Sequence, residues 1–196
     1  MSRQLGFFDA GSRVLVAGAS GSILYYPGLV APEAAARLFD ELRVSVPWRS
    51  ERRVMYEREV DVPRMVASMP IESPLAAPLA GLVPEIERIA GATFTSIGLN
   101  LYRDGHDSVA PHNDRLPELV AGKPIALLSL GATRRMTIRS KSVPRRILDL
   151  DLEPGSLLVM SYETQRHYDH GIPKTDAVVG PRISAAFRVR SGAARR

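Results

Sequence analysis

The stretch NLYRDGHDSVAPHND, residues 100–114, ends with a histidine and an aspartate two positions apart. In an extended segment residues i and i+2 project from the same face, so His112 and Asp114 would present an imidazole and a carboxylate together. One further histidine would complete a 2-His-1-carboxylate facial triad, the usual protein ligand set of a non-haem Fe(II) oxygenase. The later stretch QRHYDHGIPK contains two candidates for that ligand, His167 and His170.

Two strands offer polar faces that could complete a site around these residues. In the strand that ends at Arg103, Asn100 and Tyr102 share a face, while Leu99 and Leu101 point the other way. The last strand alternates in the same manner and places five residues on one face: Arg182, Ser184, Ala186, Arg188 and Arg190. Small residues between the arginines leave room, and a planar guanidinium suits a carboxylate held by two hydrogen bonds. The alternative is an ordinary edge strand with solvated arginines.

The composition limits both the class of protein and the kind of metal site. A chain of 196 residues with 45% hydrophobic residues can bury one substantial core, so we expect a single domain. The sequence has no cysteine, which excludes thiolate ligands and favours iron, manganese or copper over structural zinc. The net charge of +5 and the pI near 9.9 suit a polyanionic partner or an anionic small substrate.

The sequence shows neither a membrane span nor a secretory signal. No apolar run approaches the roughly 18 residues that a membrane helix needs, and residues 1–13 lack the charged and then apolar plan of a signal peptide. We therefore expect a cytoplasmic protein that does not engage a membrane.

The first ninety residues or so are predicted to supply supporting helices. Apolar residues recur with helical spacing over 32–43, with a proline at a suitable first position. A second apolar stripe over 79–90 precedes a glycine that could cap it, and Pro84 should kink or restart the helix. Gly18 and Gly21 lack the third glycine of a dinucleotide-binding turn, so we interpret them as a turn between two strands.

After residue 91 the sequence changes to short extended runs separated by Gly, Pro, Asp or Ser. The runs cover 94–103, 124–130, 134–140, 145–152, 156–162 and 182–190. This spacing predicts an antiparallel sandwich or barrel. The Arg- and Ala-rich tail, residues 191–196, is predicted to be disordered.

Four segments, in order, carry a family resemblance: NLYRDGHDSVAPHND, PIALLSLGATRRMTIR, GSLLVMSYETQRHYDHGIPK and RISAAFR. Together they resemble the AlkB family of Fe(II)- and 2-oxoglutarate-dependent dioxygenases. Upstream, LYYPGLV, the helix over 32–43 and VPW at 46–48 also resemble the start of that family.

The resemblance implies a mainly β fold with supporting α-helices, a double-stranded β-helix or jelly roll. It implies one AlkB-like domain over residues 1–190, with an N-terminal helical support region. By position, His112, Asp114 and His170 match the iron ligands of the family. His167 would point to the opposite face of the strand, into packing or behind the ligands, and His106 would lie in a loop.

The same resemblance implies Fe(II), O2 and 2-oxoglutarate as co-substrate. Arg182 matches the arginine that pairs with the distal carboxylate of 2-oxoglutarate, with Tyr102 beside it. Arg188 and Asn100 match positions nearer the iron-chelating end. Ser184 occupies a position where family members can carry asparagine.

The implied activity is oxidative demethylation of N-alkylated bases, of the 1-methyladenine and 3-methylcytosine type, in DNA or RNA. The partner would be single-stranded or duplex nucleic acid carrying alkylated bases, bound by a monomer. A run of basic residues without an intervening acid could hold the phosphates: Arg134, Arg135, Arg139, Lys141, Arg145 and Arg146. The alternative is a solvated hairpin whose charge prevents edge pairing.

Two departures from the family pattern leave the substrate open. Many relatives that demethylate nucleic acids have an acid two residues after the ligand aspartate, whereas here Leu116 stands there and Glu118 is the nearest acid. The aromatic lid is curtailed, so stacking on a base would fall to one of three tyrosines: Tyr56, Tyr162 or Tyr168. The alternatives are a same-fold oxygenase that hydroxylates a protein, lipid or small molecule, and a noncatalytic basic nucleic-acid-binding module.

Overall fold

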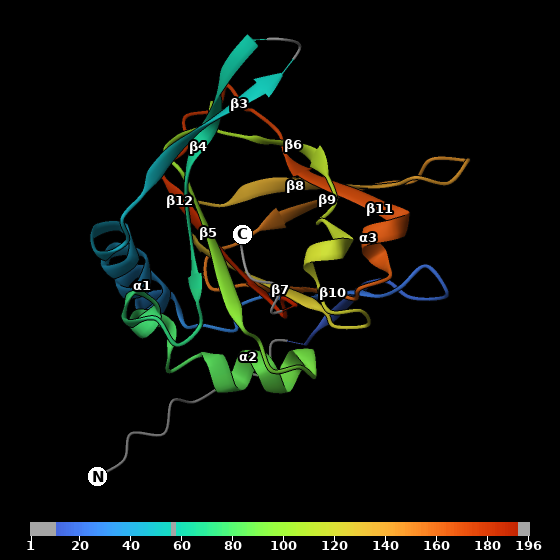
Figure 1. Ribbon diagram of the computed structural model, residues 1–196, viewed down its shortest axis with the longest axis horizontal. Helices are drawn as coiled ribbons and strands as arrows, with labels where there is room; N and C mark the ends of the chain where they lie inside the picture. The colour runs from blue at the N-terminus through green and yellow to red at the C-terminus, as the bar shows by residue number, and fades with distance from the viewer. Residues whose placement is uncertain (1–10, 56–57, 192–196) are drawn as a thin grey trace.

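Two antiparallel sheets form the body of the protein (Figure 1). The structure, a computed structural model, describes the backbone of residues 11–55 and 58–191 and their side chains outside residues 52–61. The strands are β1 (Arg13–Val16), β2 (Ile23–Tyr26), β3 (Arg49–Met55), β4 (Arg58–Pro70), β5 (Ser96–Tyr102), β6 (Val109–His112), β7 (Ile125–Gly131), β8 (Arg134–Ser140), β9 (Ile147–Leu152), β10 (Leu157–Met160), β11 (Tyr168–Ile172) and β12 (Arg182–Arg188). The helices are α1 (Pro32–Ser45), η1 (Pro74–Leu79), α2 (Val83–Ala90), η2 (Leu116–Glu118) and α3 (Thr164–His167).

The larger sheet has eight strands in the order β1-β2-β10-β7-β12-β5-β4-β3, and the smaller has four in the order β6-β11-β8-β9. The predicted mainly β fold with supporting helices is confirmed as a jelly roll. Of the two predicted arrangements, the described residues form a sandwich of two sheets and not a closed barrel. The turn predicted around Gly18 and Gly21 is also confirmed, because it joins β1 to β2.

The predicted helix over 32–43 is confirmed and continues to Ser45. A proline occupies its first turn, where the missing N–H costs no hydrogen bond. Ala35, Phe39 and Leu42 are the buried residues of α1. They pack against the eight-stranded sheet and so fix the helix on its outer side (Figure 1).

The apolar stripe over 79–90 is divided, and the proline within it restarts the helix as predicted. The 3-10 helix η1 ends at Leu79, and α2 begins at Val83 with Pro84 in its first turn. Gly91 caps the end of α2 in the left-handed conformation, with φ of 67°.

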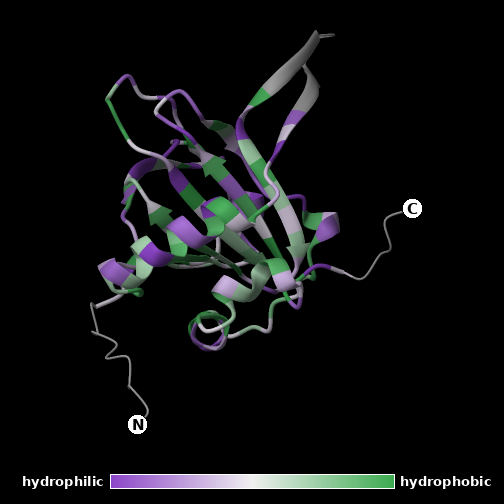
Figure 2. Ribbon diagram, turned by 90° about the vertical axis from the view of Figure 1, so that its left-hand side faces the viewer, coloured by the Kyte–Doolittle hydropathy of each residue, from purple (hydrophilic) through white to green (hydrophobic). Residues whose placement is uncertain are grey.

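Two apolar cores lie on opposite faces of the eight-stranded sheet. One joins the helices to the sheet and includes Phe39 and Phe187. The other fills the space between the sheets and includes Met136 and Ala186. Hydrophobic and hydrophilic residues alternate along many of the strands (Figure 2), because successive side chains point to opposite faces. Strand β12 therefore contributes to both cores.

Strand β12 lies in the middle of the larger sheet, paired with β7 on one side and β5 on the other. The edge-strand interpretation of this segment is therefore wrong, and Arg182 and Ser184 are each 1% exposed. The strand ends at Arg188, and Arg190 beyond it forms an isolated bridge with Leu119.

Two strands, β3 and β4, are missing from the sequence prediction, whereas β6 and β11 lie in the extended segments expected around His112 and His170. Strands β3 and β4 form a long hairpin that extends beyond the two sheets (Figure 1). Its sequence is rich in charge and lacks a clear apolar alternation, whereas the pairing of β4 with β5 establishes the strand. Tyr56 and residues 192–196 of the predicted tail lie outside the described residues.

The basic run over 134–146 does not form an unbroken positive surface. Arg135 pairs with Asp151 at 3.0 Å, and Arg139 pairs with Asp169 at 2.8 Å. These acids come from neighbouring strands, which is why the local sequence did not reveal them. In the described part of the chain, the residues of this run that are exposed and not ion-paired are Lys141, Arg145 and Arg146.

Arg134 is a structural residue on the inner face of β8, where it is 3% exposed. Its guanidinium donates hydrogen bonds of 2.7–3.4 Å to backbone carbonyls of the β5–β6 loop and of the segment after β11, those of Asp104, Gly105, Asp107 and Pro173. One side chain thus ties the loop before β6 to the chain that follows β11.

Replacing Arg134 with methionine should lower the free energy of unfolding by about 3 kcal/mol, because buried carbonyl oxygens lose a charged donor. Urea unfolding measures this change. Arg135→Met is the matched control: its ion pair is exposed and screened by solvent, so the loss of stability should be clearly smaller than for Arg134→Met. Equal losses in the two variants would contradict the structural role of Arg134.

Candidate metal and co-substrate site

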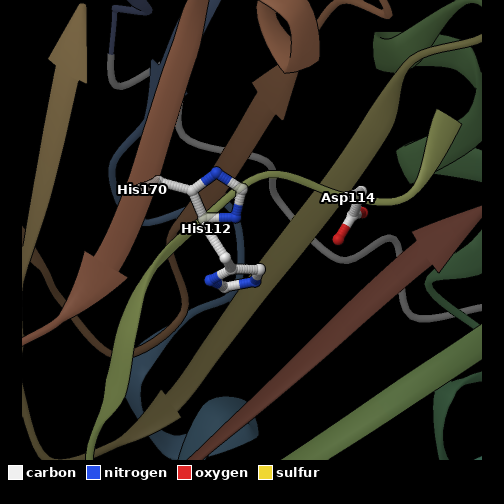
Figure 3. A group of neighbouring side chains, drawn as sticks. All are labelled: His112, Asp114 and His170. Atoms are coloured by element: carbon white, nitrogen blue, oxygen red, sulfur yellow. The ribbon is translucent and has the colours of Figure 1, made fainter. Parts of the chain in front are cut away.

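The three residues expected to be iron ligands lie together in the structure (Figure 3). His112 ends β6 and is paired across the ladder with His170 of β11, while Asp114 follows β6 in a loop. One donor atom from each residue lies within 4.8 Å of the others, and the imidazole centroids are 4.7 Å apart. The arrangement offers a 2-His-1-carboxylate set that could hold one metal ion.

Both imidazoles offer a nitrogen lone pair. Nδ1 of His112 lies 2.9 Å from the carbonyl oxygen of Ala110. Since a carbonyl only accepts, a hydrogen bond here needs the proton on Nδ1 and leaves the lone pair on Nε2. Burial, together with the charge of nearby His112, lowers the pKa of His170 to about 4. His170 is therefore neutral near pH 7, as metal binding requires.

The carboxylate of Asp114 is held by Arg188. Nε of Arg188 donates to Oδ2 at 2.6 Å, and Nη2 donates to Oδ1 at 3.1 Å. Burial by itself raises the pKa of Asp114, but the charge and hydrogen bonds of Arg188, with the two histidines, outweigh it and lower the pKa. Asp114 is therefore an ionised carboxylate in a fixed orientation, ready to bind a cation.

A cavity lined by His112 and His170 extends to a buried arginine. Arg182 is 1% exposed, and its Nη2 donates to Oγ of Ser129 at 2.9 Å. Its Nε and Nη1 have no hydrogen-bond partner among the described residues. A buried guanidinium with two unsatisfied nitrogen atoms is costly, so it points to an anionic group that belongs beside it. Paired N–H donors match a carboxylate, the chemistry of each end of 2-oxoglutarate.

The other residues expected to bind the co-substrate line the same cavity. Across β12 and β5, Arg182 is paired with Tyr102, and Ser184 with Asn100. The guanidinium carbon of Arg182 lies 5.2 Å from the centroid of the Tyr102 ring, and Nδ2 of Asn100 donates to Oγ of Ser184 at 3.4 Å. Arg188 lines the cavity at the end that holds Asp114. The structure thus brings every expected site residue to one place.

Several other predicted positions lie away from the site. His106 is in an exposed loop, as predicted. His167 ends helix α3 and is exposed, so its placement in the packing of a strand is wrong. Tyr162 and Tyr168 pack at the margin of the core between the sheets and do not line the cavity.

Two residues of the site are absent from the sequence interpretation. Arg64 of β4 lines the cavity, and its Nε donates to Oδ1 of Asn100 at 2.7 Å. Gln165 of α3 accepts a hydrogen bond from the backbone N–H of Asp114 at 2.9 Å. Neither lies at a spacing that indicates a ligand, because both reach the site through pairing between distant segments.

Comparison with known proteins identifies the family. A model of the 2OG-Fe(II) oxygenase superfamily matches residues 70–188. The chain belongs to this superfamily. Human DNA oxidative demethylase ALKBH2 is 32% identical over 194 residues, covering 87% of this chain and 74% of the relative. Human alpha-ketoglutarate-dependent dioxygenase alkB homolog 3 is 32% identical over 186 residues, covering 85% of this chain and 65% of the relative. Arabidopsis thaliana DNA oxidative demethylase ALKBH2 is 27% identical over 221 residues, covering 92% of this chain and 70% of the relative.

These matches confirm an AlkB-like member of the 2OG-Fe(II) oxygenase superfamily. The chain is therefore a dioxygenase that uses Fe(II), 2-oxoglutarate and O2, and the interpretation as a noncatalytic module is wrong. Its donor set of nitrogen and oxygen atoms and the unpaired guanidinium of Arg182 fit these groups. In the part of the chain that the structure describes, no helix is long and apolar enough to cross a membrane.

Arg182→Met should weaken 2-oxoglutarate binding by roughly 30-fold, since charged hydrogen bonds contribute about 2 kcal/mol. The free energy of unfolding should stay unchanged or rise, because an unpaired buried charge is removed. Isothermal titration and urea unfolding measure the two effects. Arg190→Met is the matched control, since Arg190 pairs with Glu118 and does not line the cavity. Equal affinity of both variants for 2-oxoglutarate would contradict the assignment.

The metal-free protein should lose stability as the pH falls from 6.5 toward about 4, because unfolded His170 takes up a proton in this window and folded His170 does not. This residue contributes a slope of at most about 1.4 kcal/mol per pH unit. Urea unfolding across the window should show a shallower slope for His170→Gln than for wild type. Parallel curves would rule out the neutral buried histidine.

Proposed function

We propose that this oxygenase removes methyl groups from N-alkylated bases, of the 1-methyladenine and 3-methylcytosine type, in DNA or RNA. The orientation of the cavity, with one end buried and the other exposed to solvent, supports this proposal. Arg182 closes the inner end at 1% exposure, whereas His112 is exposed. A co-substrate anchored at Arg182 would leave the exposed side of the donors to a substrate that arrives from solvent. The DNA oxidative demethylases among the relatives support nucleic acid as that substrate.

In this proposal His112, Asp114 and His170 hold Fe(II), and the co-substrate is bound by Arg182, Tyr102, Asn100, Ser184 and Arg188. When bound, Fe(II), 2-oxoglutarate and O2 supply the oxidation of an N-methyl carbon to N-hydroxymethyl, which breaks down to formaldehyde and the free base, while the keto acid becomes succinate and carbon dioxide.

The chain's own residues give that chemistry its geometry. Arg188 keeps Asp114 ionised and oriented, so this ligand needs no rearrangement when the metal arrives. The walls of the cavity between Arg182 and the donors are apolar in part, formed by Leu127, Met136 and Ile172. These side chains limit the water that reaches the keto acid.

The loop between β8 and β9 supports a nucleic-acid substrate. It begins at Lys141, whose Nζ donates to Oδ1 of Asn113 at 2.8 Å, so the loop starts beside the donors. Arg145 and Arg146 follow and are exposed. We propose that they contact phosphates and thereby hold a target base near the metal.

The turn after Asp114 contains the two positions considered for contact with the target base, Leu116 and Glu118. Leu116 occupies the position of the acid found in many relatives, and the carboxylate of Glu118 accepts hydrogen bonds from Arg115 at 3.4 Å and Arg190 at 2.7 Å. We propose that base selection does not depend on Glu118. An oxygenase of the same fold that acts on a protein, lipid or small molecule is the alternative. We further propose a cytoplasmic monomer with one domain over residues 1–190.

Oligonucleotides that carry 1-methyladenine or 3-methylcytosine should release formaldehyde when incubated with the protein, Fe(II), 2-oxoglutarate and air. His112→Ala or Asp114→Ala should reduce the rate by about 100-fold or more, since each removes a metal ligand. His106→Ala is the matched control, because His106 is an exposed loop residue outside the site.

The same assay separates the alternatives. Added salt should slow turnover of oligonucleotides, because phosphate contacts release counterions. Succinate formation without formaldehyde from any methylated oligonucleotide would favour the protein, lipid or small-molecule alternative. Full activity of either ligand variant would contradict the assigned metal site.

A further inference from the structure

Beyond the ligands themselves, we propose that Gln165 is a positioning residue that sets the place of Asp114 relative to His170. The proposal rests on the metal-binding roles proposed above for these two residues. Gln165 lies in α3, the short helix directly before β11, and is 1% exposed. A polar side chain buried to this extent needs defined partners.

Asp114 depends on side chains for its position, because strand β6 ends at His112. Its carboxylate is held by Arg188 of the eight-stranded sheet. Its backbone N–H donates to Oε1 of Gln165 at 2.9 Å, and Gln165 precedes the strand that carries His170. Asp114 is therefore located by one contact from each side of the sandwich.

The amide of Gln165 is fixed in orientation by Thr164. The hydroxyl of Thr164 donates to the carbonyl oxygen of Ser161 at 2.6 Å, which leaves its lone pairs to accept from Nε2 of Gln165 at 3.2 Å. The oxygen Oε1 must then face the N–H of Asp114. A flipped amide would set donor against donor, so this chain of hydrogen bonds permits a single orientation.

Lys141 joins the same two segments independently. Its Nζ donates to Oδ1 of Asn113 at 2.8 Å and to the carbonyl oxygen of Gln165 at 3.2 Å. The side chain of Asn113, next to Asp114, and the backbone of α3 are thus linked through one ammonium group. The loop after β6 and helix α3 form a unit, within which Gln165 contacts the ligand residue directly.

The test measures metal binding and not turnover. Co(II) alone, titrated into the metal-free protein and followed by visible absorption, should bind Gln165→Met about 10- to 100-fold more weakly than wild type, the usual effect of losing a contact behind a ligand. Affinity within about twofold of wild type would overturn the proposal, given that tenfold is the smallest effect expected.

Ser140→Ala is the matched control for a loss of packing or stability. Ser140 is 5% exposed, and its Oγ accepts from the backbone N–H of Arg146 at 2.8 Å, so it makes the same kind of contact away from the donors. Its thermal midpoint should fall while its Co(II) affinity stays at the wild-type value. A similar loss of affinity in this variant would overturn the proposal.

Thr164→Val keeps the test decisive if Gln165→Met does not fold. It removes the hydroxyl that orients the amide, so Co(II) affinity should fall, and an unchanged affinity would count against Gln165. Failure of the wild-type protein to bind Co(II) is a distinct result, because it would overturn the ligand set itself and the positioning role with it.

Discussion

Strand β12 carries two guanidinium groups into the space between the sheets, and only Arg188 meets a carboxylate there. Arg182 keeps two nitrogen atoms without a protein partner at 1% exposure. A charge placed in this way is tolerable only where the fold leaves room for an anion. The small side chains of Ser184 and Ala186, between the arginines, leave that room. His112 and His170 of the proposed ligand set line the same cavity as Arg182.

The proposed metal-binding half of the site is an assembly of both sheets. Pairing of β6 with β11 in the smaller sheet brings His112 beside His170, whereas Arg188 of the larger sheet holds Asp114. The two sheets must therefore keep their separation for the three donors to converge. Met136 on one sheet and Ala186 on the other belong to the core that maintains it.

Much of this site was predictable because its residues follow a period of two. His112 and Asp114 are two positions apart, and the alternation of β12 indicated which residues share the face of Arg182. The β3–β4 hairpin was not predictable, since its charged residues become a strand only through pairing with β5. Arg134 looked like a surface cation because the carbonyl groups that it binds belong to distant loops. Gln165 was missed for the same reason, since its partner lies 51 residues away.

The central place of β12 has a consequence for the dynamics of the two halves of the site. Its backbone is paired on both sides, with β5 and β7, so its amide hydrogens exchange with solvent only through large openings of the sheet. Residues 113–115 belong to no strand, so local fluctuations suffice to open them. Slow exchange is therefore expected around Arg182, and faster exchange in the backbone beside the Asp114 carboxylate, whose own orientation Arg188 maintains.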